Sequence, residues 1–278
     1  MTPPISRDLI RHPGPKRSDR ILSARGTVTT RTVTLPRGSV LMQAVAQAMD
    51  DAGCDSGVMV LDGLRIGPYR YVMPGPSHDA DHAAWYSAPR DGGSGKIVFG
   101  TAIVGRRDGA WWLHCHARWT DGDATRMGHL LPDDVKLSED AQVTLHAFKG
   151  GAFEVLHDAE TNFSIFHAMG GMADGNAVIA KINPHEDISS ALETLIHRAG
   201  FARANIHGIG SLIGAAFDGA PPMTSPISEV LIPPGAIWNG ALHLPMECVD
   251  PDNGQYAGLL TKGHAPVCVT FEVMIVAT

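Results

Sequence analysis

The sequence contains the same helical pattern twice, 147 residues apart, and this repeat restricts the folds open to the chain more than any other feature. Each pattern is a series of apolar residues that follows one face of an α-helix. Gly53 and Gly200 follow the two series, in the position where helices commonly end in a left-handed residue. We infer that the chain consists of two copies of one unit. The two series are Leu41, Ala44, Val45, Ala48, Met49 and Ala52, and Ile188, Ala191, Leu192, Leu195, Ile196 and Ala199.

Strand patterns surround both helical segments. Residues 27–35 alternate β-branched and polar side chains and predict a strand, after which Ser39 is a plausible helix N-cap. Residues 57–63 and 177–182 are apolar and predict buried strands, and each copy ends in a further strand, at 142–148 and 268–276. We therefore predict four segments. They are a basic, proline-containing arm (1–25), a first copy (26–150), a linker (151–176) and a second copy (177–278).

Composition limits the function classes. The 278 residues suffice for one large or two ordinary domains, and no apolar run approaches the roughly 20 residues that cross a bilayer. The beginning of the chain lacks the apolar region of a signal peptide, so we expect a cytoplasmic protein without membrane partners. The four cysteines contain no C-x-x-C pair, which argues against a disulfide framework or a cysteine zinc site.

Charge argues against a nucleic-acid partner for the folded body. Lys and Arg number 22 and Asp and Glu 29, a formal net charge of −7, which disfavours a phosphate-binding surface. The arm is the basic exception. We expect it to be a solvated tail or a strap between subunits, with nucleic-acid contact as the alternative. Its basic residues are Arg7, Arg11, Lys16, Arg17, Arg20 and Arg25.

Three histidines between residues 111 and 130 form the candidate metal site. His114 and His116 are two residues apart in an apolar run, so in a strand their side chains project from one face. A turn at residues 121–123 returns the chain antiparallel and brings His129 beside them. Three neutral imidazoles without an obvious fourth protein ligand are typical of an open zinc site. The alternative is that they are strand histidines satisfied by hydrogen bonds.

The second copy lacks this set. His243 aligns with His114, but Pro245 and Leu259 stand where His116 and His129 would be. The histidines are therefore not needed for the fold, which favours a chemical role in the first copy; a drifted pair of former sites is the alternative. Arg118 lies on the same strand face as His116 and suits a substrate carboxylate, or else forms a surface salt bridge.

A long polar segment, residues 74–95, interrupts the first copy. It contains His78, Asp79, Asp81, His82, Trp85 and Tyr86. Loops of this length within a compact domain are usually functional or disordered, so we consider it a candidate lid over the metal. The corresponding segment of the second copy, residues 217–227, is shorter.

The order of these motifs resembles the plants-and-prokaryotes conserved domain, or PPC domain, over residues 36–148 and 177–276. The matching motifs are His114-Cys-His116, the acidic turn, Gly128-His129-Leu130 and the bend His207-Gly-Ile-Gly-Ser-Leu212, which has drifted to Asp62-Gly-Leu-Arg-Ile66 in the first copy. The resemblance implies an α+β fold of two tandem units, each a mostly antiparallel sheet with packed helices, and frequently a trimer. It also implies kinship with acetolactate decarboxylase and a zinc-dependent ester hydrolase, which makes the three histidines metal ligands.

Two classes of function follow. The first is a zinc-dependent hydrolase or decarboxylase of a small carboxylate or ester, with iron, nickel, manganese or copper as alternative metals. The second is a non-catalytic PPC module, either a DNA-associated regulator or an oligomeric scaffold. Plant relatives of the family carry AT-hooks, but this chain has no Arg-Gly-Arg-Pro core, so nucleic-acid binding would rest on analogy. A homo-oligomer and a small-molecule substrate are the expected partners.

Overall fold

A computed structural model describes residues 7–278, and its two α-helices are α1 (Leu41–Ala52) and α2 (Ile188–Ala199). The first residues of the two helices are 147 positions apart, and so are their last residues. As predicted, Gly53 and Gly200 follow the helices in a left-handed conformation, with φ of 59° and 69°. The prediction of Ser39 as N-cap is wrong. Val40 occupies that position, and the Ser39 hydroxyl instead donates to the carbonyl oxygen of Pro36.

Strands make up most of the remaining structure, with short 3-10 helices at Arg7–Leu9 and Pro132–Asp134. The first half contains β1 (Ile21–Leu35), β2 (Ser56–Val60), β3 (Arg65–Ile66), β4 (Tyr69–Val72), β5 (Pro74–Gly75), β6 (Trp85–Tyr86), β7 (Arg90–Gly92), β8 (Gly95–Arg107), β9 (Ala110–Asp121), β10 (Ala124–Leu130) and β11 (Ala141–Lys149). The second half contains β14 (Ala177–Ile182), β15 (Ala204–Leu212), β16 (Ala215–Phe217), β17 (Ala220–Met223), β18 (Glu229–Leu231), β19 (Ile237–Trp238), β20 (Leu242–His243), β21 (Pro245–Val249), β22 (Gln255–Leu259) and β23 (Val267–Ala277). Between the halves lie β12 (Gly151–His157) and β13 (Ser164–Gly170).

The two halves connect their strands in the same order. In the first half the sheet runs β1, β11, β2, β8, β9, β10, and in the second it runs β14, β23, β15, β18, β21, β22. In both, the strand before the helix and the strand after it flank the last strand. Pairing among the described residues is antiparallel apart from one parallel contact, between β12 and β8. The predicted mostly antiparallel sheets with two packed helices are confirmed.

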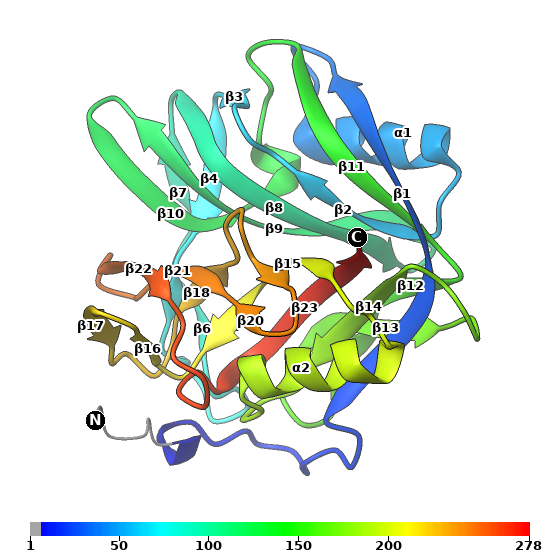
Figure 1. Ribbon diagram of the computed structural model, residues 1–278. Coiled ribbons are helices and arrows are strands. Elements are labelled where there is room, and N and C mark those ends of the chain that lie inside the picture. The colour runs from blue at the N-terminus through cyan, green and yellow to red at the C-terminus, as the bar shows by residue number, and fades with distance from the viewer. Residues whose placement is uncertain (1–6) are drawn as a thin grey trace.

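β1 belongs to both halves (Figure 1). Residues 21–26 pair with β14, and residues 27–35 pair with β11, so one strand runs the height of the molecule. The strand begins six residues earlier than predicted because Ile21 and Ala24 pack inward: Ala24 is 1% exposed. In Figure 1 the first half lies above the second, with α1 toward the top and α2 toward the bottom.

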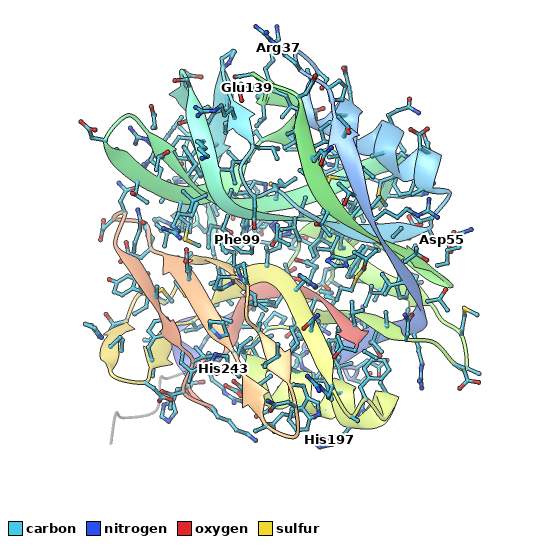
Figure 2. The ribbon with its side chains drawn as sticks, turned by 45° about the horizontal axis from the view of Figure 1, so that its top comes forward. Arg37, Asp55, Phe99, Glu139, His197 and His243 are labelled. Carbon is cyan, nitrogen blue, oxygen red and sulfur yellow. The ribbon has the colours of Figure 1, made fainter. Side chains whose placement is uncertain are left out.

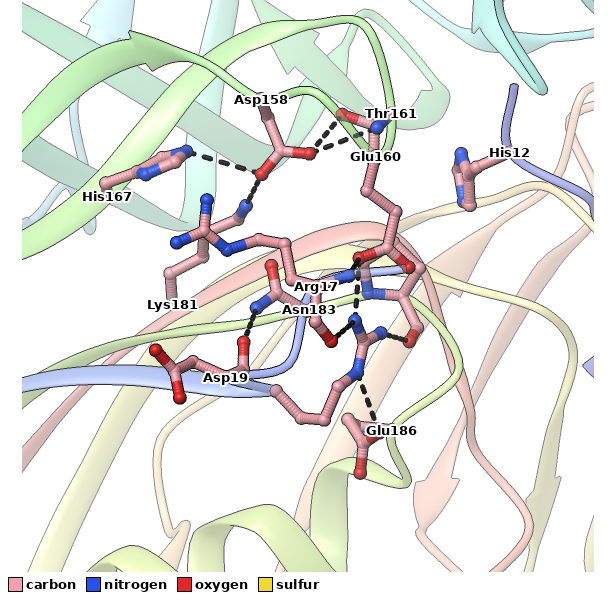
Figure 3. Close-up of polar contacts among 12 residues, drawn as sticks. His12, Arg17, Asp19, Asp158, Glu160, Thr161, His167, Lys181, Asn183 and Glu186 are labelled. Carbon is pink, nitrogen blue, oxygen red and sulfur yellow. Dashed lines mark hydrogen bonds and ion pairs between the residues drawn. The ribbon is translucent and has the colours of Figure 1, made fainter. Parts of the chain in front are cut away.

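Part of the arm contacts the folded body. Ile10 is buried, and Nε2 of His12 hydrogen-bonds the carbonyl oxygen of Cys268. Nη1 of Arg20 lies 2.6 Å from Oε2 of Glu160, and its Nε lies 3.2 Å from Oε1 of Glu186 (Figure 3). The arm is therefore held on the body at Ile10, His12 and Arg20, whereas Arg11 and Lys16 are exposed. Residues 1–6 lie outside the described part.

The segment predicted to be a linker forms the hairpin of β12 and β13. Phe153 pairs with Ala168 across it, and Phe153 and Phe166 are both buried in the core. Both arms of the hairpin contain β-branched and aromatic residues, Phe153 and Val155 in one and Ile165 and Phe166 in the other, which favour strands. The hairpin therefore joins the two halves as part of the folded body.

The main hydrophobic cluster includes residues of both halves, and a second cluster, from Val178 to Ile275, belongs to the second half. Phe99 and the interior residues of the first half pack in one cluster with Ile209, Leu231 and Met274 of the second half. Figure 2 places Phe99 between the strands of the two halves. Each such fully buried apolar side chain contributes about 1.5–3 kcal/mol relative to exposure. Neither described helix has the length and hydropathy needed to cross a membrane.

Candidate metal centre

The hairpin of β9 and β10 brings the three predicted histidines together. His116 lies directly opposite His129 in the register, and His114 precedes His116 on the same face of β9. The ring centroids of His114 and His116 are 4.6 Å apart, and those of His114 and His129 are 4.9 Å apart. Cys115, between the first two, is buried on the other face of the strand. The local sequence thus produces the cluster through strand alternation and one tight turn.

The second half supplies a fourth donor, Glu229 of β18, which sequence reasoning missed. One nitrogen from each of the three histidines and one oxygen of Glu229 all lie within 4.8 Å of one another. His116 and Glu229 are both buried. A signal was present, because Glu229 is the one charged residue at the start of the apolar strand Glu-Val-Leu-Ile. Its position beside the histidines depends on how the halves pack.

Hydrogen bonds orient the rings of His114 and His116. Nδ1 of His116 lies 2.8 Å from the carbonyl oxygen of Val230, and Nδ1 of His114 lies 3.0 Å from Oε2 of Glu272. Both partners accept, so each Nδ1 donates and each Nε2 retains a lone pair. The two Nε2 atoms are 3.0 Å apart, and that of His116 is 2.5 Å from Oε2 of Glu229. Acceptors that converge in this way need a proton or a cation between them, which fits a metal site.

Burial acts on the protonation of the cluster. Burial lowers the pKa of His129, and the neighbouring His114 and His116 rings lower it further, to well below its ordinary value. His129 is therefore neutral, and its buried Nδ1 has no hydrogen-bond partner in the described chain. Burial also acts to lower the pKa of His116, but the charge and hydrogen bond of Glu229 outweigh it and the pKa is raised. The converging histidine nitrogens and the Glu229 carboxylate thus favour a proton or a cation between them.

Glu272 of β23 forms a second layer behind His114. Its Oε2 accepts from Nδ1 of His114, and its Oε1 accepts from the Thr270 hydroxyl at 2.8 Å. Carboxylates that hold the outer nitrogen of a ligating histidine fix its tautomer and ring orientation. Sequence reasoning missed Glu272 too, although it is the one charged residue in an otherwise mostly apolar strand.

A cavity of about 120 Å³ adjoins the cluster, with His114 and Glu229 in its wall. The 74–95 segment contributes to this wall through Pro74, Ala84, Trp85 and Tyr86, so it covers the space beside the histidines. The Tyr86 ring lies 5.1 Å from that of His129. Burial, with the charges of Glu229 and Glu272, raises the pKa of Tyr86 well above its ordinary value, so its phenol keeps the proton.

Arg118 does not line this cavity. Its Nε lies 2.8 Å from Oε2 of Glu247, in an ion pair between β9 and β21. The role of substrate-carboxylate ligand stays a prediction, and the ion pair corresponds to the alternative considered for it. In the second half, Pro245 pairs with Leu259, the same register that joins His116 and His129 in the first half.

Comparisons with known proteins give structural matches only. No family model matches the sequence, and no curated protein matches it. A metal-containing protein from Archaeoglobus fulgidus is 16% identical with a TM-score of 0.41, over 51% of this chain and 96% of its own. A plant- and prokaryote-conserved (PPC) protein from Pyrococcus horikoshii is 16% identical with a TM-score of 0.39, over 52% and 95%. A protein from Ralstonia eutropha, described there as a candidate for DNA binding, is 16% identical with a TM-score of 0.38, over 51% and 95%. The family that the sequence resembles is thus among the structural matches, each covering about half of this chain.

Proposed function

We propose that this chain binds one divalent metal ion, zinc by default, through His114, His116, His129 and Glu229. The observation that carries the proposal is the convergence of four buried or half-buried donor atoms within 4.8 Å of one another. Three imidazoles and a carboxylate are donors that zinc accepts, and iron, nickel, manganese and copper accept them as well. The sequence resemblance to the PPC domain supports the same three histidines.

We infer further that the site serves hydrolysis or decarboxylation of a small ester or carboxylate. A metal bound there supplies a Lewis acid that polarises a carbonyl oxygen or acidifies water. The protein contributes the rest. Val230 and Glu272 hold the His116 and His114 rings in place, and Tyr86 keeps a proton that it can donate in a hydrogen bond to substrate.

The tandem arrangement is also a proposal. Equal helix offsets, equal strand order and the matching registers of His116 with His129 and of Pro245 with Leu259 support duplication of one unit. Under this proposal the metal centre lies between copies, since one copy supplies the histidines and the other supplies Glu229. Assembly of the chain into a trimer remains a prediction.

The DNA-associated alternative gains no support from Arg20 and Arg25 of the arm, whereas Arg7, Arg11 and Lys16 are exposed. Arg20 is engaged by Glu160 and Glu186, and the Arg25 guanidinium bonds the carbonyl oxygen of Gly175 and packs over Phe201. These cations face the protein and are neutralised or covered there. A non-catalytic scaffold remains the alternative to an enzyme.

The enzyme proposal is tested by turnover. Purified protein is stripped with a chelator, reloaded with zinc, and assayed on small esters and on 2-oxo and 3-oxo acids. We expect turnover in the reloaded protein and in His243→Ala, the exposed counterpart of His114, and its loss in the stripped protein and in His116→Ala. Turnover that survives in His116→Ala, or a metal-loaded protein inert on every substrate class, would contradict the proposal.

A further inference from the structure

We propose that the cavity beside the metal centre binds a single neutral aromatic ring, so that the substrate is a monocyclic aromatic acyl compound whose carbonyl or carboxylate end reaches the metal. This inference rests on the proposed function and narrows its substrate class. It starts from the composition, charge and size of the cavity wall.

Aromatic side chains from three distant segments form much of the wall. Trp85 and Tyr86 come from the 74–95 segment, Trp112 from β9, and Phe163 and Phe166 from the hairpin between the halves. Aromatic walls favour a flat aromatic ligand, because ring pairs in stacked or edge-on contact add about 0.5–1.5 kcal/mol to the burial itself. The wall is therefore suited to a ring more than to a polar chain.

Trp85 and Phe163 make a small aromatic cluster at this wall. Their rings are 5.2 Å apart and nearly parallel, at 27°, and the His82 ring lies 4.4 Å from Trp85 and 4.7 Å from Phe163. His82 is held in turn by Asp79, with Nδ1 3.0 Å from Oδ1. Trp85 is 37% exposed, so the cluster lies between the cavity and solvent. Contacts between the two segments thus keep the wall closed over the cavity.

Charge at the wall excludes a second anionic group on the ligand. Among the described residues that line the cavity there is no lysine or arginine, whereas Glu229 and Glu272 both line it. Arg118 is paired with Glu247 outside the wall. A phosphate or a second carboxylate would meet these carboxylates without a compensating cation, at a cost of several kcal/mol. The part of the ligand away from the metal is therefore neutral.

Ser211 and Ser228 add little polarity to the wall, because their hydroxyls form hydrogen bonds within the protein. The Ser228 hydroxyl bonds the backbone of Leu212, donating to its carbonyl oxygen at 3.1 Å and accepting from its amide at 3.2 Å. Ser211 accepts from the amide of Val269 at 2.9 Å. The Ser228 hydroxyl is thus engaged as donor and acceptor and that of Ser211 as acceptor, while the third serine of the wall, Ser164, is exposed. The remaining surface presented to the ligand is largely aromatic and aliphatic.

Size limits the ligand to one ring. The cavity measures about 120 Å³, and an apolar protein cavity of about 150 Å³ holds benzene. A monocyclic ring is close to this size, whereas a fused bicyclic ring exceeds it and would extend out of the cavity. Because His114 and Glu229 belong to the same wall, a ring in the cavity places an attached carbonyl group at the metal centre.

Two metal-binding probes with different tails test the inference. Acetohydroxamate and benzohydroxamate carry the same chelating group, and calorimetry on zinc-loaded protein compares their dissociation constants. We expect benzohydroxamate to bind at least about tenfold more tightly, and 2-naphthohydroxamate to lose that gain. The gain should fall at least about fivefold in Phe163→Ala and persist in Trp111→Ala, whose ring stacks on Arg106 outside the cavity. Equal affinity of the first two probes for the loaded wild type would overturn the inference.

A second measurement separates this inference from the proposed function. Ligand-observed NMR with benzyl alcohol on chelator-treated protein detects ring binding without any metal. Binding in the wild type and its loss in Phe163→Ala supports the cavity even if metal analysis finds no metal and the proposed function fails. A protein that holds zinc but binds neither benzyl alcohol nor the phenyl tail would retain the proposed metal site and refute the aromatic substrate class.

Discussion

Lys181 is a charged residue buried among apolar neighbours on β14 (Figure 3). Its ammonium donates to Oδ2 of Asp158, and Nε2 of His167 lies 3.3 Å from the same oxygen. Burial acts to raise the pKa of Asp158, but the hydrogen bonds from His167 and Lys181 outweigh it, so that the pKa lies far below its ordinary value. Both side chains, Lys181 and Asp158, are fully buried. Each of the two buried charges is therefore stabilised by the other.

We predict that Lys181→Met lowers the free energy of unfolding by about 3–5 kcal/mol, because it leaves the Asp158 carboxylate buried without its cation. Adding Asp158→Asn should recover part of that loss. Urea unfolding of the two variants measures it, with Lys262→Met as the exposed control, since Lys262 pairs with Glu193 at the surface. A Lys181→Met variant as stable as the Lys262→Met control would contradict the buried ion pair.

His146 and His207 form a half-buried pair, with ring centroids 4.4 Å apart between β11 and β15. Burial, with a small contribution from His146, lowers the pKa of His207 to about 3. Burial lowers the pKa of His146 as well. Both rings are thus neutral in the folded protein and titrate near 6.5 when unfolded. Below that pH the unfolded state binds more protons than the folded state, so the free energy of unfolding decreases as the pH is lowered.

We predict that the free energy of unfolding contributed by His207 is fully present above about pH 6.5 and decreases from there toward pH 3, by up to about 1.4 kcal/mol per pH unit. His207→Gln should flatten this part of the profile relative to the wild type. Urea midpoints at a series of pH values measure the slope, and His243→Gln, an exposed histidine, is the control. Parallel profiles for wild type and His207→Gln would contradict the assignment.

Among the elements, the β9–β10 hairpin and the α-helices were open to prediction from sequence. Alternation on β9 and the turn at 121–123 determine that His116 faces His129, and apolar periodicity with Gly53 and Gly200 defines the helix ends. Glu229 lies one hundred residues after His129 in the chain. No local pattern reports which strand of the other half will pack against β9, so the fourth donor and Glu272 were not predictable. The contacts of Arg20 and Phe153 with the body were likewise not predictable, because their partners Glu160 and Ser56 lie far from them in the sequence.

We predict that β23 orients the His114 ligand of the proposed metal site through Glu272. Glu272→Gln keeps the size of the side chain but weakens its acceptance from Nδ1 of His114, so we expect metal affinity to fall about 10–100-fold without unfolding. Competition with a metal-sensitive dye measures the dissociation constant. Glu247→Gln is the matched control, because Glu247 pairs with Arg118 instead of a histidine of the cluster. Equal losses in both variants would indicate a general effect of charge.

At the scale of the whole molecule, we expect the halves to unfold as one cooperative unit. β1 pairs with β11 and with β14, and the main core cluster includes residues of both halves. The candidate metal centre likewise draws residues from both halves, with histidines from the first half and Glu229 from the second. Separation of the halves would open the core and the site together. Function is thereby linked to the packing of the halves.

We predict a single unfolding transition in urea. Tryptophan fluorescence reports mostly on the first half, where four of the five tryptophans lie, and far-ultraviolet circular dichroism reports on both. The two transitions should coincide for the wild type, because the main core cluster contains residues of both halves and β1 pairs with strands of both. The Trp238→Phe variant, which leaves only first-half tryptophans, should give the same midpoint by both probes. Two separate transitions would show that the halves are independent domains.

The most direct test of the account is metal content. Untagged wild type, the His114→Ala/His116→Ala double variant and the His243→Ala control are offered zinc, dialysed and measured by elemental analysis, with circular dichroism to verify folding. The account predicts about one metal ion per chain in wild type and control, and none in the folded double variant. Equal metal in all three proteins, or none in the wild type after zinc is offered, would contradict it.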